Sequence, residues 1–209
     1  MPYRVLIVDD QQIPRQLFEN TVAASDRYTL AAALDSAAMA DAWCAGALVD
    51  LIVMDVVLSD GPNGLEAAGR IKASYPNIKI IVVTSLPDML FLERAKQIGV
   101  DSFWYKELQS APLLEVMDRT MAGEHIWPDH PPQKKLGLAD SSELTDREME
   151  VLRLLARGLS DKEISEQLHM SFNTVRYHVD NLKNKTGQAS RTGLAVLAVM
   201  SGIVFPGIE

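Results

Sequence analysis

A short apolar run that ends directly in a carboxylate sets the strongest limit on the fold of this chain. Leu51, Ile52, Val53 and Met54 precede Asp55, and polar residues flank the run. Four consecutive apolar residues of this kind are typical of a strand that is buried on both faces of a parallel sheet. An acid at the end of such a strand lies at the carboxyl edge of the sheet, where open α/β folds place their chemistry. The run therefore predicts an α/β domain with a functional site at one edge.

Three further strand-like runs end in polar side chains in the same way, at 3–8, 79–83 and 102–105. The side chains that follow these runs are Asp9 and Asp10, Thr84 and Ser85, and Lys106. For any one of them, an ordinary polar strand end is the simpler interpretation. Because the carboxyl ends of parallel strands meet at one edge, however, four such ends in order predict a cluster of polar groups.

The chain divides into two domains and a connection. Strand and helix patterns alternate five times over residues 1–121, which predicts a parallel sheet with helices on both faces. Residues 122–142 contain Pro and Gly without a periodic pattern, so we expect an interdomain linker. Residues 143–209 predict an all-α domain of four helices, the first capped by Thr145 with Glu148 and the third by Asn173. A turn of about four residues joins the second and third helices, as in a helix-turn-helix.

The composition fits a two-domain protein outside the membrane. A chain of 209 residues can form two cores, and no apolar run reaches the roughly 18 to 20 residues of a spanning helix. The N-terminus lacks a basic region followed by an apolar one, so we expect a cytoplasmic protein. The net charge of −8 argues against indiscriminate binding of nucleic acid. Arg176, Lys183, Lys185 and Arg191, against Asp180, nevertheless form a small basic patch.

The residues expected at the sheet edge suit phosphoryl chemistry. Asp9, Asp10 and Asp55 would repel one another unless a hard cation lies among them, and Mg²⁺ is the natural occupant of such a set of oxygen ligands. Asp55 ends the central strand and is therefore the best candidate for a nucleophile toward phosphorus. Thr84 can donate a hydrogen bond to a phosphoryl oxygen, and Lys106 can pair with another.

Five residues carry a resemblance to a known family: Asp9, Asp10, Asp55, Thr84 and Lys106. At these spacings in a fivefold βα pattern, they resemble the receiver domain of bacterial two-component response regulators. The resemblance implies a flavodoxin-like, doubly wound, five-stranded parallel sheet of order 2-1-3-4-5 over residues 1–121. It also implies that a histidine kinase phosphorylates Asp55, that the three carboxylates and the backbone carbonyl of Val57 bind Mg²⁺, and that Thr84 and Lys106 respond to the phosphate.

Other positions of this domain differ from the family or leave alternatives open. The aromatic residue three before the lysine rotates on activation in the family; here it is Phe103, which lacks a hydroxyl and fits a switch residue or plain core equally well. Ser59 and Glu107 stand where the family often has proline, which affects loop geometry alone. Val57 and Leu86 flank the path of an attacking water in the family. Because both are apolar, we expect slow loss of the phosphate, although Leu86 could instead pack against a neighbouring subunit.

Three motifs, at 144–152, 158–164 and 174–178, carry a second resemblance: L-T-x-R-E-x-E-V-L, G-L-S-x-K-E-I and T-V-x-x-H. They are similar to the LuxR-type DNA-binding domain of NarL/FixJ-class regulators, whose third helix enters the major groove. Helical phasing places Val175, Val179 and Leu182 inside the domain. It leaves Arg176 and Asp180 outside, where Arg176 could read guanine and Asp180 could accept from cytosine. The residues expected at DNA are Lys162, Thr174, Arg176, Tyr177, Asp180, Lys183, Lys185 and Arg191, and the lysines with Arg191 suit phosphate contacts.

The last predicted helix has apolar surface beyond what so small a domain must bury. In the family the equivalent helix forms a dimer contact, which here implies Leu194, Leu197 and Ala198, with Met200 and Val204 as further candidates. The alternative is that all three belong to the core.

Together these interpretations predict a response regulator that is a transcription factor. Phosphorylation of Asp55 by a histidine kinase, with Mg²⁺, is expected to control homodimerisation and binding to double-stranded promoter DNA, with RNA polymerase as a further partner. We expect no enzymatic activity beyond slow loss of the protein's own phosphate. A phosphatase is a rival interpretation, but Val57 stands where a phosphatase would need a general acid. A second alternative is a DNA-binding regulator that is never phosphorylated and uses its receiver domain for protein interactions.

Overall fold

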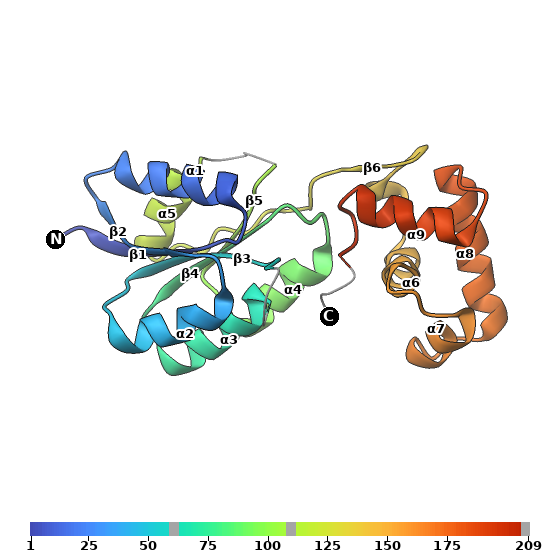
Figure 1. Cartoon of the computed structure of the whole chain (residues 1–209), viewed down its shortest axis with the longest axis horizontal. Coiled ribbons are helices and arrows are strands. Elements are labelled where there is room, and N and C mark those ends of the chain that lie inside the picture. The colour runs from blue at the N-terminus through green and yellow to red at the C-terminus, as the bar shows by residue number, and fades with distance from the viewer. Residues whose placement is uncertain (59–62, 108–111, 206–209) are drawn as a thin grey trace. The chain divides into compact units, whose positions relative to one another are not determined.

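The computed structural model describes residues 1–58, 63–107 and 112–205 (Figure 1). The chain forms two compact units, residues 1–131 and 132–209. Among the described residues, no helix has the length and apolar character needed to cross a membrane.

The first unit is a doubly wound α/β domain, as predicted. Its five strands form one parallel sheet in the order β2-β1-β3-β4-β5. The strands are β1 (Tyr3–Val8), β2 (Tyr28–Leu34), β3 (Leu51–Asp55), β4 (Lys79–Thr84) and β5 (Ser102–Tyr105). The helices are α1 (Gln12–Ala23), α2 (Ala37–Gly46), α3 (Gly64–Ser74), α4 (Met89–Ile98) and α5 (Leu113–Met121). Figure 1 shows α1 and α5 on one face of the sheet and α2, α3 and α4 on the other.

Alternate side chains of the sheet supply the two halves of its core. All five residues of β3 are buried. Val53 packs in a cluster with Phe18 of α1 and Val116 of α5. Because successive side chains of a strand point to opposite faces, Ile52 and Met54 face the layer of α2, α3 and α4. The two apolar layers fix the sheet, and with it the ends of β1, β3, β4 and β5 at one edge.

The first half of the expected linker forms no helix or strand, as predicted, but it packs against the first unit. The backbone N–H of Phe103 donates to the Ile126 carbonyl oxygen at 2.9 Å, and the N–H of Ile126 donates to Ser102 Oγ at 3.1 Å. Lys96 Nζ lies 5.4 Å from the centre of the Trp127 ring. These contacts cover the free edge of β5, which would otherwise expose unpaired backbone groups.

The second half of the expected linker is also ordered and belongs to the second unit. β6 (Lys135–Leu136) and β7 (Ala139–Asp140) form a short antiparallel hairpin. Gly137 in its turn has a φ of +65°, and a Cβ there would lie 2.2 Å from the Thr186 carbonyl oxygen, so the turn requires glycine. Leu136 is fully buried in the core of the unit.

The second unit contains the four predicted helices. They are α6 (Asp146–Ala156), α7 (Asp161–Gln167), α8 (Phe172–Thr186) and α9 (Arg191–Met200), preceded by a short 3-10 helix, η1 (Ser141–Glu143). Thr145 and Glu148 form the predicted capping box of α6. The α8 helix begins earlier than predicted, because Ser171 and not Asn173 caps it by accepting from the Thr174 N–H.

Candidate functional site

Three carboxylates meet at the carboxyl edge of the sheet. Asp9 follows β1, Asp55 ends β3, and Asp10 lies beside Asp9. One carboxylate oxygen from each lies within 4.8 Å of those of the other two. Asp9 and Asp55 are almost fully buried, so their charges are shielded from water. Three oxygen ligands on one side of a small space are a donor set suited to Mg²⁺, which binds few carboxylates and keeps several waters.

Lys106 lies between two of these carboxylates. Its Nζ donates to Asp9 Oδ2 and to Asp55 Oδ2, both at 2.7 Å. Its backbone N–H donates to the Thr84 carbonyl oxygen at 2.9 Å, which fixes the residue beside the end of β4. Burial alone would lower the pKa of Lys106, but the two carboxylates outweigh that effect and hold the pKa above its ordinary value. The lysine is therefore a fixed positive charge at the edge.

Asp55 combines burial with ionisation. Burial raises the pKa of Asp55 to about 6, because Lys106 offsets only part of the cost of burying the charge and Asp9 adds to that cost. The carboxylate is mostly ionised at neutral pH, as a nucleophile toward phosphorus must be.

Thr84 ends β4 at the same edge and is fully buried. Its Oγ1 accepts a hydrogen bond from the Leu86 N–H at 3.1 Å, so the side chain is held at the start of the loop before α4. The structure thus brings together the five residues predicted for this edge.

Gly64 is a residue of the site that the sequence reasoning missed. It begins α3 after the loop that follows Asp55, and its N–H donates to the Val56 carbonyl oxygen at 3.0 Å. A Cβ at this position would lie 1.7 Å from the carbonyl oxygen of Asp55. No real Cβ contact is that short, so only glycine lets α3 begin against the backbone of the acceptor. A glycine at the first position of the helix, soon after the acidic strand end, was the available signal.

The positions that differ from the family lie close to this edge where the structure describes them. Phe103 is buried and makes an edge-to-face contact with Tyr105, with ring centres 5.0 Å apart. Leu86 is buried as well, and Val57 is half-buried. Ser59 lies outside the described residues, and Glu107 is exposed.

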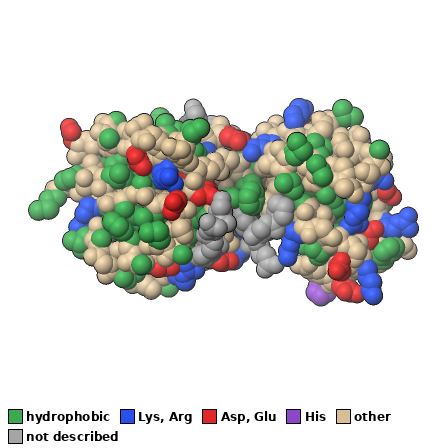
Figure 2. Space-filling view, viewed as in Figure 1, with side chains coloured by type: hydrophobic (Ala, Val, Ile, Leu, Met, Phe, Trp, Pro, Cys, Tyr) green, Lys and Arg blue, Asp and Glu red, His purple; other side chains and the backbone are tan. Residues whose placement is uncertain are grey.

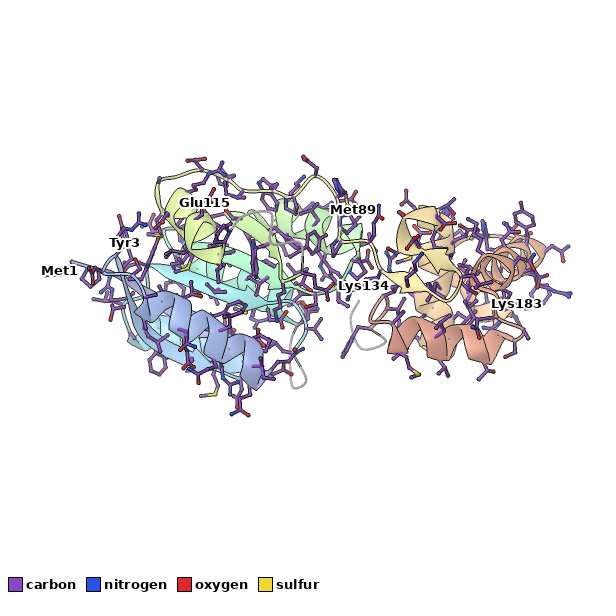
Figure 3. All side chains as sticks on the ribbon, turned by 90° about the horizontal axis from the view of Figure 1, so that it is seen from above. Met1, Tyr3, Met89, Glu115, Lys134 and Lys183 are labelled. Carbon is purple, nitrogen blue, oxygen red and sulfur yellow. The ribbon has the colours of Figure 1, made fainter. Side chains whose placement is uncertain are left out.

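The α8 helix of the second unit presents a polar face. Val175, Val179 and Leu182 are buried, as the predicted phasing requires. Among the predicted DNA contacts on this helix, Arg176, Tyr177 and Asp180 are exposed, and Thr174, Lys183 and Lys185 are partly exposed. Lys183, shown on α8 in Figure 3, donates to Asp180 Oδ1 at 3.1 Å. Lys162 is exposed on α7.

Two protein-family models match this chain. The response regulator receiver domain model matches residues 5–118. The chain belongs to this family. The model of the bacterial regulatory proteins of the luxR family matches residues 142–198, so this response regulator carries a LuxR-type DNA-binding domain. Both resemblances drawn from the sequence are confirmed.

Several known proteins align with this chain over nearly its whole length. The response regulator protein VraR of Staphylococcus aureus is 29% identical over 209 residues, which cover 98% of this chain and all of VraR. A structure of two RcsB dimers bound to two parallel DNAs aligns with a TM-score of 0.62 at 18% identity, over 97% of this chain and all of that one. RcsB from Salmonella enterica serovar Typhimurium, bound to promoter P1flhDC with the phosphomimetic BeF3⁻, aligns with a TM-score of 0.64, at the same identity and coverage. At this identity the structures support the shared fold.

Two residues of the response regulator that were predicted to contact phosphates have partners within their own domain. Lys185 Nζ donates to Glu148 Oε2 and to the Glu143 carbonyl oxygen, both at 2.8 Å. Arg191 bonds to the Asp161 carboxylate and the Leu159 carbonyl oxygen. These cations join α8 to α6 and α9 to α7. On the face of this domain that Figure 2 shows, the Lys and Arg side chains lie in several separate groups.

The predicted dimer residues of the response regulator lie mostly in the core of its DNA-binding domain. Leu194 and Ala198 are fully buried, and Leu197 is partly buried against the same core. Leu194 and Ala198 therefore cannot reach a partner, and the prediction is wrong for these two. Val204 is buried as well, whereas the exposed apolar residues of α9 are Met200, one of the further candidates, and Val196 and Val199.

Proposed function

We propose that this response regulator is a transcription factor switched by phosphorylation of Asp55, with a histidine kinase as phosphodonor. The observation that carries the proposal is the buried arrangement of Asp9, Asp55 and Lys106 at the end of β3, which pairs an ionised acceptor with a fixed cation. Asp10 completes a set of three carboxylates within reach of one metal ion. Promoter DNA is the proposed ligand, so we place the protein in the cytoplasm.

The residues of this edge have separate roles in the transfer of the phosphoryl group. Asp9, Asp10 and Asp55, with the backbone carbonyl of Val57, would hold Mg²⁺, which when bound neutralises charge on the phosphoryl oxygens. An oxygen of Asp55 forms a bond to phosphorus as the bond from phosphorus to the donor nitrogen breaks and the donor imidazole takes up a proton. Lys106 then pairs with a phosphoryl oxygen, and the Thr84 hydroxyl donates to another.

Control of DNA binding requires a path from this edge to the second domain. Lys106 follows β5 directly, and the segment that leaves the receiver domain is hydrogen-bonded to β5 at Ser102 and Phe103. Movement of β5 therefore acts on the start of the connection at Ile126. We place the dimer contact of the active form on the exposed α9 residues Val196, Val199 and Met200, in line with the DNA-bound RcsB dimers.

Phosphoryl transfer from acetyl phosphate tests the proposal. With Mg²⁺ we expect the intact mass of the wild type to rise by one phosphoryl group, and we expect no rise for Asp55→Asn, because the amide lacks the nucleophilic oxygen. Omission of Mg²⁺ should also prevent the rise. After removal of the donor, the label should persist for longer than seconds, because Val57 and Leu86 cannot orient a water.

The result that would contradict phosphorylation is an unlabelled wild type under conditions that label a control receiver domain. It would favour the alternative in which the receiver acts as a protein-interaction module and DNA binding does not depend on phosphate.

DNA recognition is tested on the outer face of α8. We expect Arg176→Ala to weaken binding to a site selected from random DNA by about 1–3 kcal/mol and to relax the preference at one base pair, because Arg176 is exposed and is the residue proposed to read guanine. Lys162→Ala, the matched control, should weaken binding to all sequences and reduce the salt dependence. Fluorescence anisotropy at several salt concentrations measures both effects. An Arg176→Ala variant with unchanged sequence preference would remove Arg176 from base recognition.

A further inference from the structure

The Tyr105 hydroxyl is buried and has no hydrogen-bond partner among the described residues. The whole residue is 2% exposed, so bulk solvent does not reach the hydroxyl. Buried hydroxyls are nearly always hydrogen-bonded, because an unpaired donor keeps the full cost of losing water. Because the unpaired Tyr105 hydroxyl lies next to the functional edge, we expect a second state of the protein in which this hydroxyl is paired.

The position of Tyr105 ties its hydroxyl to the phosphorylation site. Tyr105 is the last residue of β5, pairs with Thr84 in the β4–β5 ladder and directly precedes Lys106. Its ring contacts Phe103, two residues earlier on the same face of the strand. Phe103 has no hydroxyl. Tyr105 therefore carries the phenol on this face of β5, at the end of the strand where the phosphoryl group is formed.

The segment between Thr84 and α4 supplies an acceptor for this hydroxyl. Asp88 caps α4 by accepting from the Leu90 N–H at 3.0 Å, directly before Met89, the first residue of the helix (Figure 3). Asp88 is buried, and burial together with its charge raises the pKa of Tyr105 above the ordinary value. The phenol therefore stays a proton donor. A carboxylate accepts several hydrogen bonds, so Asp88 can accept a further one.

We propose that Tyr105 is a positioning residue that couples Thr84 to α4: when the Thr84 hydroxyl turns to the phosphoryl group, the segment 85–88 shifts and the Tyr105 hydroxyl donates to Asp88. The bond that Thr84 makes with the Leu86 N–H holds this segment in the unphosphorylated form. Its loss frees the segment to move toward the buried phenol. The inference rests on the proposed phosphorylation of Asp55 and adds the residue that stabilises the phosphorylated conformation.

Removal of this hydroxyl should act in opposite directions on the two forms. In the unphosphorylated form, Tyr105→Phe deletes an unpaired buried donor, so thermal stability should rise. In the phosphorylated form it deletes a hydrogen bond. Because a ligand that selects one conformation binds more weakly when that conformation becomes less favourable, the affinity for BeF3⁻ with Mg²⁺ should fall by about tenfold.

The experiment compares Tyr105→Phe with Tyr28→Phe on the full chain. The Tyr28 hydroxyl bonds to Asp118 Oδ1 at 2.8 Å, so its loss should lower the melting temperature and leave the affinity for BeF3⁻ unchanged. Titration of BeF3⁻ at fixed Mg²⁺, followed by intrinsic fluorescence, gives the affinity, and thermal melts without BeF3⁻ give the stability. A Tyr105→Phe variant with lowered melting temperature or unchanged affinity would overturn this inference. A wild type that binds no BeF3⁻ would instead overturn the proposed phosphorylation itself.

Discussion

Gly64→Ala is expected to destabilise the receiver domain by about 3 kcal/mol or more and to abolish phosphorylation of Asp55. The new Cβ would lie 1.7 Å from the Asp55 carbonyl oxygen and 2.8 Å from the carbonyl carbon. Both atoms belong to the backbone, so neither can rotate away, and the chain must move either α3 or the end of β3. A shift of β3 displaces the acceptor relative to Asp9 and Lys106. Urea unfolding and labelling by acetyl phosphate measure the two effects.

Gly69→Ala is the matched control in the same helix. A Cβ at Gly69 would lie 3.6 Å from Ile98 Cγ2, which is an ordinary contact. Because alanine favours a helix over glycine, this variant should be as stable as the wild type or gain up to about 1 kcal/mol. Equal urea midpoints for Gly64→Ala and Gly69→Ala would show that α3 does not approach the Asp55 backbone so closely.

The sequence could predict which strand ends form the site but not which backbone atoms approach each other there. The apolar runs before Asp9, Asp55, Thr84 and Lys106 define where strands end, and parallel topology then brings the four ends to one edge. Local sequence could not show that α3 begins against the Asp55 carbonyl, because this contact joins the start of a helix to the end of a strand and leaves no sequence pattern.

The connection after α5 was predicted as irregular for a related reason. Residues 122–142 have no hydrophobic period, because their order comes from single contacts with other elements. Ile126 pairs with the backbone of β5, and Leu136 fills a place in the core of the second unit. Neither contact leaves a repeating signature.

In the DNA-binding domain, residue type alone does not predict what a charged side chain contacts. Helical phasing placed Val175 and Val179 inside correctly, since burial follows the 3.6-residue period. The same period cannot tell whether a cation such as Lys185 faces DNA or a buried acid. Glu148 is almost fully buried, and its pKa is held low because Lys185 and the Thr145 N–H outweigh the cost of burial. The buried carboxylate of Glu148 therefore holds Lys185, a pairing that residue type alone could not predict.

Lys106→Met should cost the receiver domain about 3–5 kcal/mol in the absence of Mg²⁺, because it leaves Asp9 and Asp55 buried without their shared cation. Addition of Mg²⁺ should restore much of the lost free energy of unfolding, since a metal ion that binds only the folded form stabilises that form. The wild type should gain less from Mg²⁺, because Lys106 already neutralises the same two carboxylates. Urea unfolding in EDTA and in excess Mg²⁺ measures both gains.

Lys79→Met separates this charge effect from the loss of any paired lysine. Lys79 Nζ donates to Asp101 Oδ1 at 2.9 Å, but Asp101 also accepts from Lys72 Nζ and from the Ile80 N–H. Because Asp101 keeps two donors, we expect a loss of less than about 1 kcal/mol that does not depend on Mg²⁺. If Lys106→Met lost the same free energy of unfolding in EDTA and in Mg²⁺, the loss would not come from the two carboxylates left without a cation. A loss that Mg²⁺ reverses identifies Lys106 as the cation that keeps the acceptor site folded until a metal ion binds the two carboxylates and Lys106 pairs with the phosphoryl group.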